Sequence, residues 1–399
     1  MATKTFFNFN LFDGLHNLTQ KSAWFKVDTL TGKIISLGTS NPENNPEKSN
    51  IMVDLKQKYV MPGLINVHTH ISGDPDSFDG NFNRSEAEIA VEAYQNLQIL
   101  LKSGVTYIRE CGCAYDIDIK LKKSQKEGRI SKIPSMITSG RALSMTGGHG
   151  DGPNVSYLTD SPDEVRKATR TAFRNGADCI KVMATGGVMS PGDFMNDPQL
   201  SIEEMRTAVI EAHHKRKTVA AHAEGNPGIK YAILAGVDSI EHGFYVNDED
   251  IKLMLERGTY LTPTLLAETL IPKFGKNVLP DWELKKAADA LDDTFVNLSA
   301  AFEKGIKFTC GTDAGSPFNG YDKTPFEFEL LTKLGMTPFE VYQCSTINSA
   351  KLCQIDDEYG KLEAGKIADF IVLDSNPLED VKALQQLDKQ VFQKAIRQY

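Results

Sequence analysis

Two histidines, His68 and His70, are the residues of this 399-residue chain whose type and spacing point most directly to chemistry. They end the segment Met61-Pro-Gly-Leu-Ile-Asn-Val-His-Thr-His70, where an apolar run becomes polar. Alternate side chains of a strand share a face, so both imidazoles would point the same way. Two imidazoles on one face can bind a single borderline-soft cation. The pair alone is a weak signal, because such spacing often arises by chance.

Further residues of ligand type end other short apolar runs in the same way: Lys181, His222, His242 and Asp313. Six such residues at equivalent positions favour a metalloenzyme. Simpler interpretations stay open for three of them. Lys181 could form a Schiff base, His242 could pair with Glu241 at the surface, and Asp313 could be a turn residue.

The composition limits the partners of the chain. A net charge of −9, from 44 basic and 53 acidic residues, disfavours nucleic acid or an anionic membrane. The N-terminus lacks the order of a signal peptide, and no apolar stretch approaches the ~18 residues of a membrane span. The six cysteines are scattered, which fits free thiols in a reducing compartment. We therefore expect a cytoplasmic protein.

The interior repeats one pattern, in which a helix-like stretch is followed by a glycine and a short apolar run. Glycine can end a helix in the left-handed conformation. Repetition of the whole pattern predicts alternating helices and parallel strands rather than isolated caps. The glycines are Gly104, Gly176, Gly236, Gly258 and Gly305.

Eight strands and the helices between them predict a (β/α)8 TIM barrel, in which chemistry occurs at the C-terminal strand ends. The six ligand candidates fall there. A doubly wound open sheet would not gather ligands from the first strand to the eighth. Ser161 and Ser201, each followed by Glu three residues later, predict helix starts. The strands are 64–70, 106–111, 135–140, 179–185, 218–223, 239–242, 260–263 and 307–311, and the main helices are 85–102, 161–175, 201–216 and 283–304.

The two ends of the chain differ from this interior. Residues 1–60 and 357–399 contain short strand-like runs separated by turn residues. We expect them to pair into one small β-sandwich domain beside a barrel of residues 61–356.

Several segments of the chain carry a family resemblance: Met61–His70, 180–187, His222, Ile240-Glu-His-Gly243, Gly311-Thr-Asp313 and 360–374. Together they resemble the amidohydrolase superfamily, and most closely its imidazolonepropionase-related, prolidase-like branch of Xaa-Pro dipeptidase-like metallopeptidases. The resemblance covers nearly the whole chain.

The resemblance implies two divalent metal ions, usually Zn²⁺. His68, His70 and Asp313 would hold the more buried ion, His222 and His242 would hold the other, and a carbamate formed by CO₂ on Lys181 would bridge them. A water between two metal ions ionises near pH ~7, and the resulting hydroxide would attack the amide carbonyl. Asp313 would accept the proton and pass it to the leaving nitrogen.

Loops after the strands supply candidate substrate contacts. His149 lies in Met145-Thr-Gly-Gly-His-Gly-Asp-Gly152, which resembles a substrate loop of the family, although a loop histidine in water is the alternative. Gly187, Val188 and Met189 follow the strand of Lys181 and could present backbone groups to a substrate.

Two departures from the family pattern matter. Many prolidase-like relatives have His-Ala-Tyr after strand five, whereas this chain has His222-Ala-Glu224. Glu224 would either face a basic substrate group or pair with a protein cation such as Lys230. The C-terminus, 385–399, lacks the clean strand–turn–strand ending of the family.

Other residues near the strand ends have structural interpretations. Arg109 resembles a structural arginine of the family. Its neighbour Glu110 stands where Asp is more usual. Cys111 and Cys113 are better explained as small buried thiols than as a thiolate site.

We predict a two-metal hydrolase that cleaves an amide bond in a small molecule, either a dipeptide or an N-acyl amino acid, and that forms a homo-oligomer. Hydrolysis of a cyclic amide or lactone would need the same centre. A Schiff-base aldolase rests on Lys181 alone. A non-catalytic scaffold is disfavoured because all six ligand candidates are present.

Overall fold

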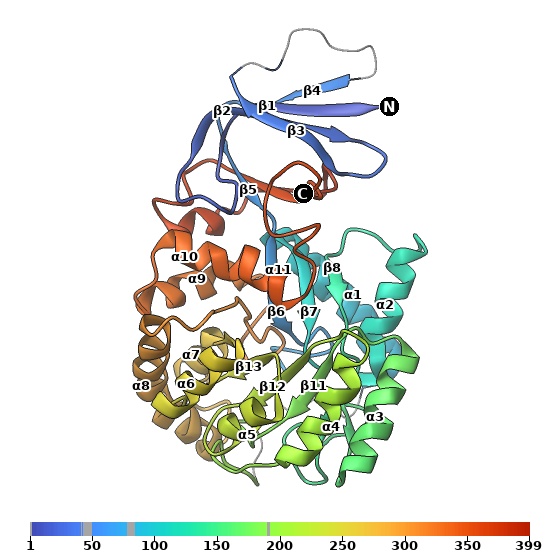
Figure 1. Ribbon diagram of the computed structural model, residues 1–399, viewed down its shortest axis with the longest axis vertical. Coiled ribbons are helices and arrows are strands. Elements are labelled where there is room, and N and C mark those ends of the chain that lie inside the picture. The colour runs from blue at the N-terminus through green and yellow to red at the C-terminus, as the bar shows by residue number, and fades with distance from the viewer. Residues whose placement is uncertain (1, 41, 43–49, 78–83, 190–191) are drawn as a thin grey trace.

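The computed structural model describes residues 2–40, 42, 50–77, 84–189 and 192–399. Figure 1 shows a β-rich region that contains both chain ends and a larger region in which helices surround parallel strands. In the described part of the chain, no helix is long and apolar enough to cross a membrane.

Strands and helices alternate through the larger region, as predicted, and the strands form two parallel sheets. One sheet has the order β6-β7-β8, and the other has the order β10-β9-β11-β12-β13-β14. The short strands β9 and β10 were not predicted. The bounds are β6 Leu64–Thr69, β7 Val105–Glu110, β8 Ser135–Ile137, β9 Ala142–Ser144, β10 Ser156–Leu158, β11 Ile180–Met183, β12 Val219–Ala223, β13 Ser239–His242 and β14 Tyr260–Thr262.

The four predicted helices begin and end within three residues of the predicted bounds. Ser161 accepts a hydrogen bond from the amide of Glu164, and Ser201 and Glu204 form a reciprocal capping box. The helices are α1 Glu86–Ser103, α2 Ile117–Lys126, α3 Pro162–Asn175, α4 Ile202–His213, α5 Gly228–Ala235, α6 Asp248–Arg257, α7 Leu265–Phe274, α8 Asp281–Glu303, α9 Thr324–Lys333, α10 Pro338–Gln343 and α11 Ser349–Leu352. Left-handed glycines end four of them: Gly104, Gly176, Gly236 and Gly258.

Residues 307–311 were predicted to form the eighth strand. This prediction is wrong, because the segment does not form a regular strand. Its backbone bonds first to β14, where Leu261 N donates to Lys307 O (3.0 Å). It then bonds to β6, where Val67 N donates to Cys310 O (2.8 Å). No single partner strand runs along the segment, so no ladder forms, but the segment still connects the edges of the two sheets.

The other edge of the first sheet, at β8, also bonds to the second sheet, beside β11. Cys179 N, just before β11, donates to Thr138 O, just after β8 (3.2 Å). The structure therefore has two parallel sheets joined by a few backbone hydrogen bonds, where one continuous eight-stranded barrel was predicted.

Both ends of the chain contribute to one eight-stranded sheet, in the order β17-β16-β15-β5-β1-β2-β3 with β4 beside β1. Pairing of distant ends agrees with the prediction, whereas the two layers of a sandwich stay a prediction. Phenylalanines from both ends form its core: Phe6, Phe25, Phe370 and Phe392. The bounds are β1 Thr3–Leu11, β2 Gln20–Asp28, β3 Ile34–Thr39, β4 Asn50–Asp54, β5 Tyr59–Pro62, β15 Phe370–Leu373, β16 Gln390–Gln393 and β17 Ile396–Arg397.

The C-terminal segment forms a strand–turn–strand hairpin, β16–β17, which its sequence did not indicate. Lys394 and Ala395 make the turn with φ of +49° and +61°. Left-handed turns usually use glycine or asparagine, so this turn had no sequence signature. Asp369 fixes it by accepting from Lys394 N (2.8 Å).

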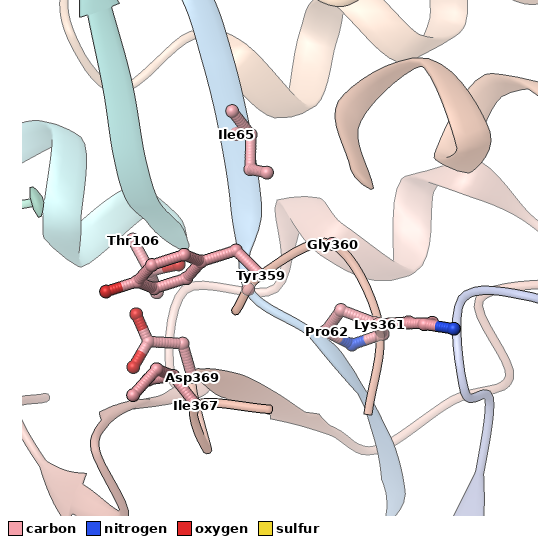
Figure 2. Close-up of a pocket in the computed structure, with 9 residues that line it drawn as sticks. Pro62, Ile65, Thr106, Tyr359, Gly360, Lys361, Ile367 and Asp369 are labelled. Atoms are coloured by element: carbon pink, nitrogen blue, oxygen red, sulfur yellow. The ribbon is translucent and has the colours of Figure 1, made fainter. Parts of the chain in front are cut away.

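A small pocket lies at the start of β6, where the two regions meet (Figure 2). It is lined by Gly63, which precedes that strand, by Ile65 of the strand, and by Tyr359 and Asp369, among others. His68 and His70 lie at the other end of the same strand. The pocket in Figure 2 is therefore separate from the predicted site.

Candidate metal centre

His68, His70 and Asp313 converge at the C-terminal end of β6. The Nε2 atoms of the histidines are 3.3 Å apart, and Asp313 Oδ1 lies 3.3 Å from His68 Nε2 and 3.0 Å from His70 Nε2. Ligand atoms of a tetrahedral zinc site, each ~2.0–2.1 Å from the ion, are about 3.3 Å apart. The three atoms thus have the separation of ligands that share one ion.

Buried partners orient His68. Its Nδ1 lies 2.8 Å from Glu241 Oε2, and the other oxygen of Glu241 accepts from Arg109 (2.6 Å). The three side chains are fully buried. Burial alone would raise the pKa of Glu241, but the Arg109 guanidinium holds it below its usual range. An ionised Glu241 keeps the proton of His68 on Nδ1, which leaves the Nε2 lone pair facing Asp313.

Two sets of hydrogen bonds hold His70 in place: one from its own ring to the backbone, and one from its neighbours Thr69 and Ile71 to Glu110. Its Nδ1 donates to Gly112 O (2.9 Å), so Nε2 carries the lone pair. The buried carboxylate of Glu110 accepts from Thr69 Oγ1 (2.7 Å) and from Ile71 N (2.8 Å). Glu110 therefore holds both residues that flank His70, a role its sequence position did not reveal.

His222 and His242 lie side by side on β12 and β13, with ring centroids 4.7 Å apart. His222 Nε2 lies 3.1 Å from Gly186 O, and His242 Nδ1 lies 2.7 Å from Thr264 Oγ1. Each bond occupies one ring nitrogen and leaves the other available. His242 is buried, so the alternative of a surface ion pair is wrong.

Lys181 lies beside the first of these groups. Its side chain is buried on β11, and Nζ lies 3.5 Å from His68 Nε2. After burial, the charge of Lys181 is among the causes that lower the pKa of His68, His222 and His242. Neutral imidazole is the form that binds metals.

Asp313 and His242 adopt left-handed backbone conformations, with φ of +59° and +72°. Such conformations cost non-glycine residues of order 1 kcal/mol or more and cluster at functional sites. Burial opposes ionisation of Asp313, but its neighbours His68 and His70 hold its pKa well below the usual range.

The ligand-type side chains form three groups among the described residues, and one of them is explained without a metal. The first is His68, His70 and Asp313, and the second is His222, Glu224 and His242. The third contains Cys111 with His68 and Glu241. Burial raises the pKa of the Cys111 thiol to about 12, and Sγ donates to Val67 O (3.4 Å). Cys111 is therefore a buried thiol, as the sequence indicated.

The candidate substrate loops lie against the second group. The ring of His149 stacks on that of His222, with centroids 4.2 Å apart and planes at 11°. Gly187 touches both rings, because a Cβ added there would lie 2.6 Å from His149 Cε1. Val188 is buried and Met189 is exposed. Burial lowers the pKa of His149 to about 4, so its imidazole is neutral.

Glu224 lies inside this site rather than beside Lys230. Its carboxylate is buried, with Oε1 3.8 Å from His222 Nε2. Lys230 instead pairs with Glu249 (2.6 Å), because α5 carries its side chain to the surface, where α6 supplies the acid. The predicted pairing of Glu224 with Lys230 is wrong.

Two further buried polar residues were missed by the sequence analysis. Lys286 of α8 contacts the candidate site, where it donates to Gly187 O (3.1 Å), and Glu268 of α7 is buried with an unpaired oxygen. Neither ends an apolar run, so no pattern in the sequence distinguishes them from ordinary helix residues.

Comparison with known proteins identifies the family. Residues 59–393 match the amidohydrolase family. The chain belongs to that family. It is 33% identical over 365 residues to ochratoxinase of Aspergillus niger, which covers 82% of this chain and 72% of that protein. A crystal structure of a Xaa-Pro dipeptidase with bound methionine in the active site has a TM-score of 0.92 at 31% identity, over 99% of both chains. A prolidase complexed with N-methylphosphonate-L-proline has a TM-score of 0.91 at 28% identity, over 99% of both chains.

These matches confirm the predicted superfamily and its prolidase-like resemblance. This amidohydrolase is a hydrolase of amide carbon–nitrogen bonds, and its α/β fold is TIM-barrel-like.

Proposed function

We propose that this amidohydrolase uses two divalent metal ions, most simply Zn²⁺, to cleave an amide bond in a dipeptide or an N-acyl amino acid. The observation that carries the proposal is the proximity of two groups of ligand atoms, which meet where the rings of His68 and His242 lie 5.0 Å apart, with Lys181 beside His68. The 3.0–3.3 Å separations within the first group suit a shared ion.

The chain offers a complete set of ligands for this purpose. His68, His70 and Asp313 would hold one ion, and His222 and His242 would hold the other. Lys181 cannot bind a cation as an ammonium. As a carbamate formed with CO₂ it would offer an oxygen to each ion, and its buried position beside His68 suits that role.

When bound, the metal pair would supply Lewis-acid activation of the amide carbonyl and of a water molecule. Asp313 would accept the proton of that water and deliver it to the leaving nitrogen. Its lowered pKa keeps the carboxylate in the basic form at neutral pH. His149, stacked on His222, would orient the substrate. We assign these steps to residues 61–356.

The substrate class is supported by the similar proteins, which are named as a Xaa-Pro dipeptidase, a prolidase and an ochratoxinase. The first two names denote enzymes that cleave dipeptides. An amide that joins an amino acid to a small acyl group is therefore the first class to test.

Elemental analysis and a hydrolysis screen test the proposal together. Protein produced with zinc and bicarbonate should contain close to two ions per chain and should cleave members of a dipeptide and N-acyl-amino-acid panel. Lys181→Ala should lose metal and most activity, and acetate should restore part of both by supplying carboxylate oxygens. Wild-type protein without metal under these conditions, or full activity of the variant, would contradict the proposal.

A further inference from the structure

A buried lysine of α8 is bound to residues that follow β11. Lys286 is 9% exposed, and a buried ammonium is tolerated only where acceptors surround it. Its Nζ donates to Gly187 O (3.1 Å) and to the carbonyl of Asp193, and it lies 3.8 Å from Asp193 Oδ1. The ring centroids of Trp282 and Phe194 are 5.1 and 5.2 Å from the same ammonium. Lys286 therefore connects α8 to both Gly187 and Asp193.

The carboxylate of Asp193 extends this connection. Gly187 N donates to Oδ1 (3.3 Å), and Gln199 Nε2 donates to Oδ2 (2.8 Å). Burial raises the pKa of this carboxyl, and the ammonium of Lys286 is among the neighbours that oppose the rise. A carboxylate only accepts hydrogen bonds, so the NH₂ group of Gln199 must face Asp193. The amide oxygen of Gln199 is thereby directed to the other side.

That amide oxygen holds the backbone of His149. Gln199 Oε1 accepts from His149 N (2.9 Å), and the carbonyl of His149 accepts from Ser144 Oγ (2.7 Å). Rotation of the Gln199 amide would place its NH₂ group against the His149 N–H, where two donors would face each other. The first route from Lys286 to His149 therefore runs through Asp193 and Gln199.

A second route reaches the ring of the same histidine. Gly187, whose carbonyl accepts from Lys286, packs directly against this ring, because a Cβ added at Gly187 would lie 2.7 Å from His149 Nδ1. The opposite neighbour of the ring is His222, on which it stacks at 4.2 Å. Both the backbone and the ring of His149 thus depend on residues that Lys286 holds.

We propose that Lys286 is a positioning residue, which holds the imidazole of His149 where the substrate binds. The inference rests on the proposed function, in which His149 orients the substrate. Lys286 acts through other residues and needs no contact with the substrate itself. A shift of ~1 Å in a group that orients a substrate can cost ~10²-fold in rate, so loss of this anchor should be measurable at the scissile bond.

Kinetics of variants of metal-loaded enzyme test the assignment. Lys286→Met removes the ammonium and keeps an apolar side chain of similar length. We expect kcat/KM for the best substrate of the amide panel to fall about tenfold or more, with metal content unchanged. Lys285→Met is the matched control on the same helix, because Lys285 pairs with Asp289 at the surface (2.6 Å), and it should stay within about twofold of wild type. An unchanged kcat/KM in Lys286→Met would overturn the assignment.

A double-mutant cycle separates positioning of His149 from a general loss of structure. In a His149→Ala background, Lys286→Met should lower kcat/KM by less than about twofold more, because the residue that it positions is absent. Equal losses in the two backgrounds would overturn the inference. Gln199→Met interrupts the first route at another point, so the same cycle with this variant decides the question if Lys286→Met does not fold.

Hydrogen–deuterium exchange measured by mass spectrometry tests the connection without turnover. Peptides that contain His149 and Gly187 should exchange faster in Lys286→Met than in wild type or Lys285→Met, because local opening becomes easier once the anchor is lost. Unchanged exchange in both peptides would overturn the inference and leave the proposed function intact. Faster exchange in an enzyme that cleaves no member of the panel would reject the proposed function and keep the connection between Lys286 and His149.

Discussion

Asp313 combines, in one side chain, the features of a metal ligand and of a proton acceptor. Its Oδ1 lies within 3.3 Å of Nε2 of both His68 and His70, and its lowered pKa keeps it ionised, so that it can bind a metal and has no proton of its own to lose first. Asp313→Asn keeps an oxygen at this place but cannot accept a proton. We expect kcat to fall ~10²–10⁴-fold, the range for a positioned acid–base group, with a smaller loss of metal.

Steady-state kinetics with parallel elemental analysis measures both effects. Asp163→Asn is the matched control, because that aspartate is exposed on α3 and should leave kcat unchanged. An unchanged kcat at saturating substrate in Asp313→Asn would remove Asp313 from proton transfer and leave it a ligand only.

The position of a single side chain was predicted well where side chains alternate regularly between the two faces of a strand, and poorly where that alternation fails. Alternation places His68 and His70 on one face, and the structure brings them together. The same alternation predicts that the side chains of Glu241 and His242, which are adjacent in the chain, point to opposite faces of β13. The left-handed conformation of His242 breaks the alternation, so Glu241 contacts His68 while the ring of His242 lies 5.0 Å from the same histidine. Side chains such as Glu268 depend on tertiary packing and leave no local trace in the sequence.

At the scale of elements, a single carboxylate connects two helices near the site. Glu327 of α9 is fully buried and accepts from the first two amides of α7, Leu265 N and Leu266 N, at 2.8 Å each. These amides have no partner within their own helix. Glu327→Ala would leave two buried donors unsatisfied and should lower the free energy of unfolding by about 2–4 kcal/mol.

Urea unfolding of Glu327→Ala measures this loss. Glu256→Ala is the control, because Glu256 is exposed on α6 and should change stability by less than about 0.5 kcal/mol. Equal stability of the two variants would mean that α7 begins without help from α9.

Elements were predictable where local chemistry decides them. Serine caps and left-handed glycines mark helix ends, and the structure has them where they were predicted. The segment 307–311 looked like a strand because it is apolar and follows a helix. It does not form one, because its backbone bonds first to Leu261 of β14 and then to Val67 of β6, so no single partner strand runs along it. Those bonds join residues far apart in the chain, which no local pattern reports.

At the scale of the whole molecule, the eight-stranded sheet connects the two ends of the chain to the strand that carries the first ligands. β5 pairs with β15, with Met61 opposite Ile371, and the chain passes from β5 directly into β6. Alternating runs at both ends predicted such a shared unit, but the partners of each strand could not be predicted, because pairing is decided by contacts across more than 300 residues of sequence.

Phe370 is the residue on which this sheet depends most clearly. It is fully buried on β15, stacks on Phe392 with centroids 4.4 Å apart, and meets Phe6 and Phe25 edge-on at 5.0 and 5.1 Å. Phe370→Ala would leave a cavity between strands from both ends and should lower the free energy of unfolding by ~3–5 kcal/mol. Phe326→Ala, at an exposed phenylalanine of α9, is the matched control and should cost less than about 1 kcal/mol.

Because the aromatic core lies away from the ligand cluster, the folded fraction of Phe370→Ala should keep its metal content and its kcat. Thermal unfolding monitored together with metal release tests this expectation. Metal lost before the β-rich region unfolds would show that the end sheet positions the ligands of β6 as well as stabilising the chain.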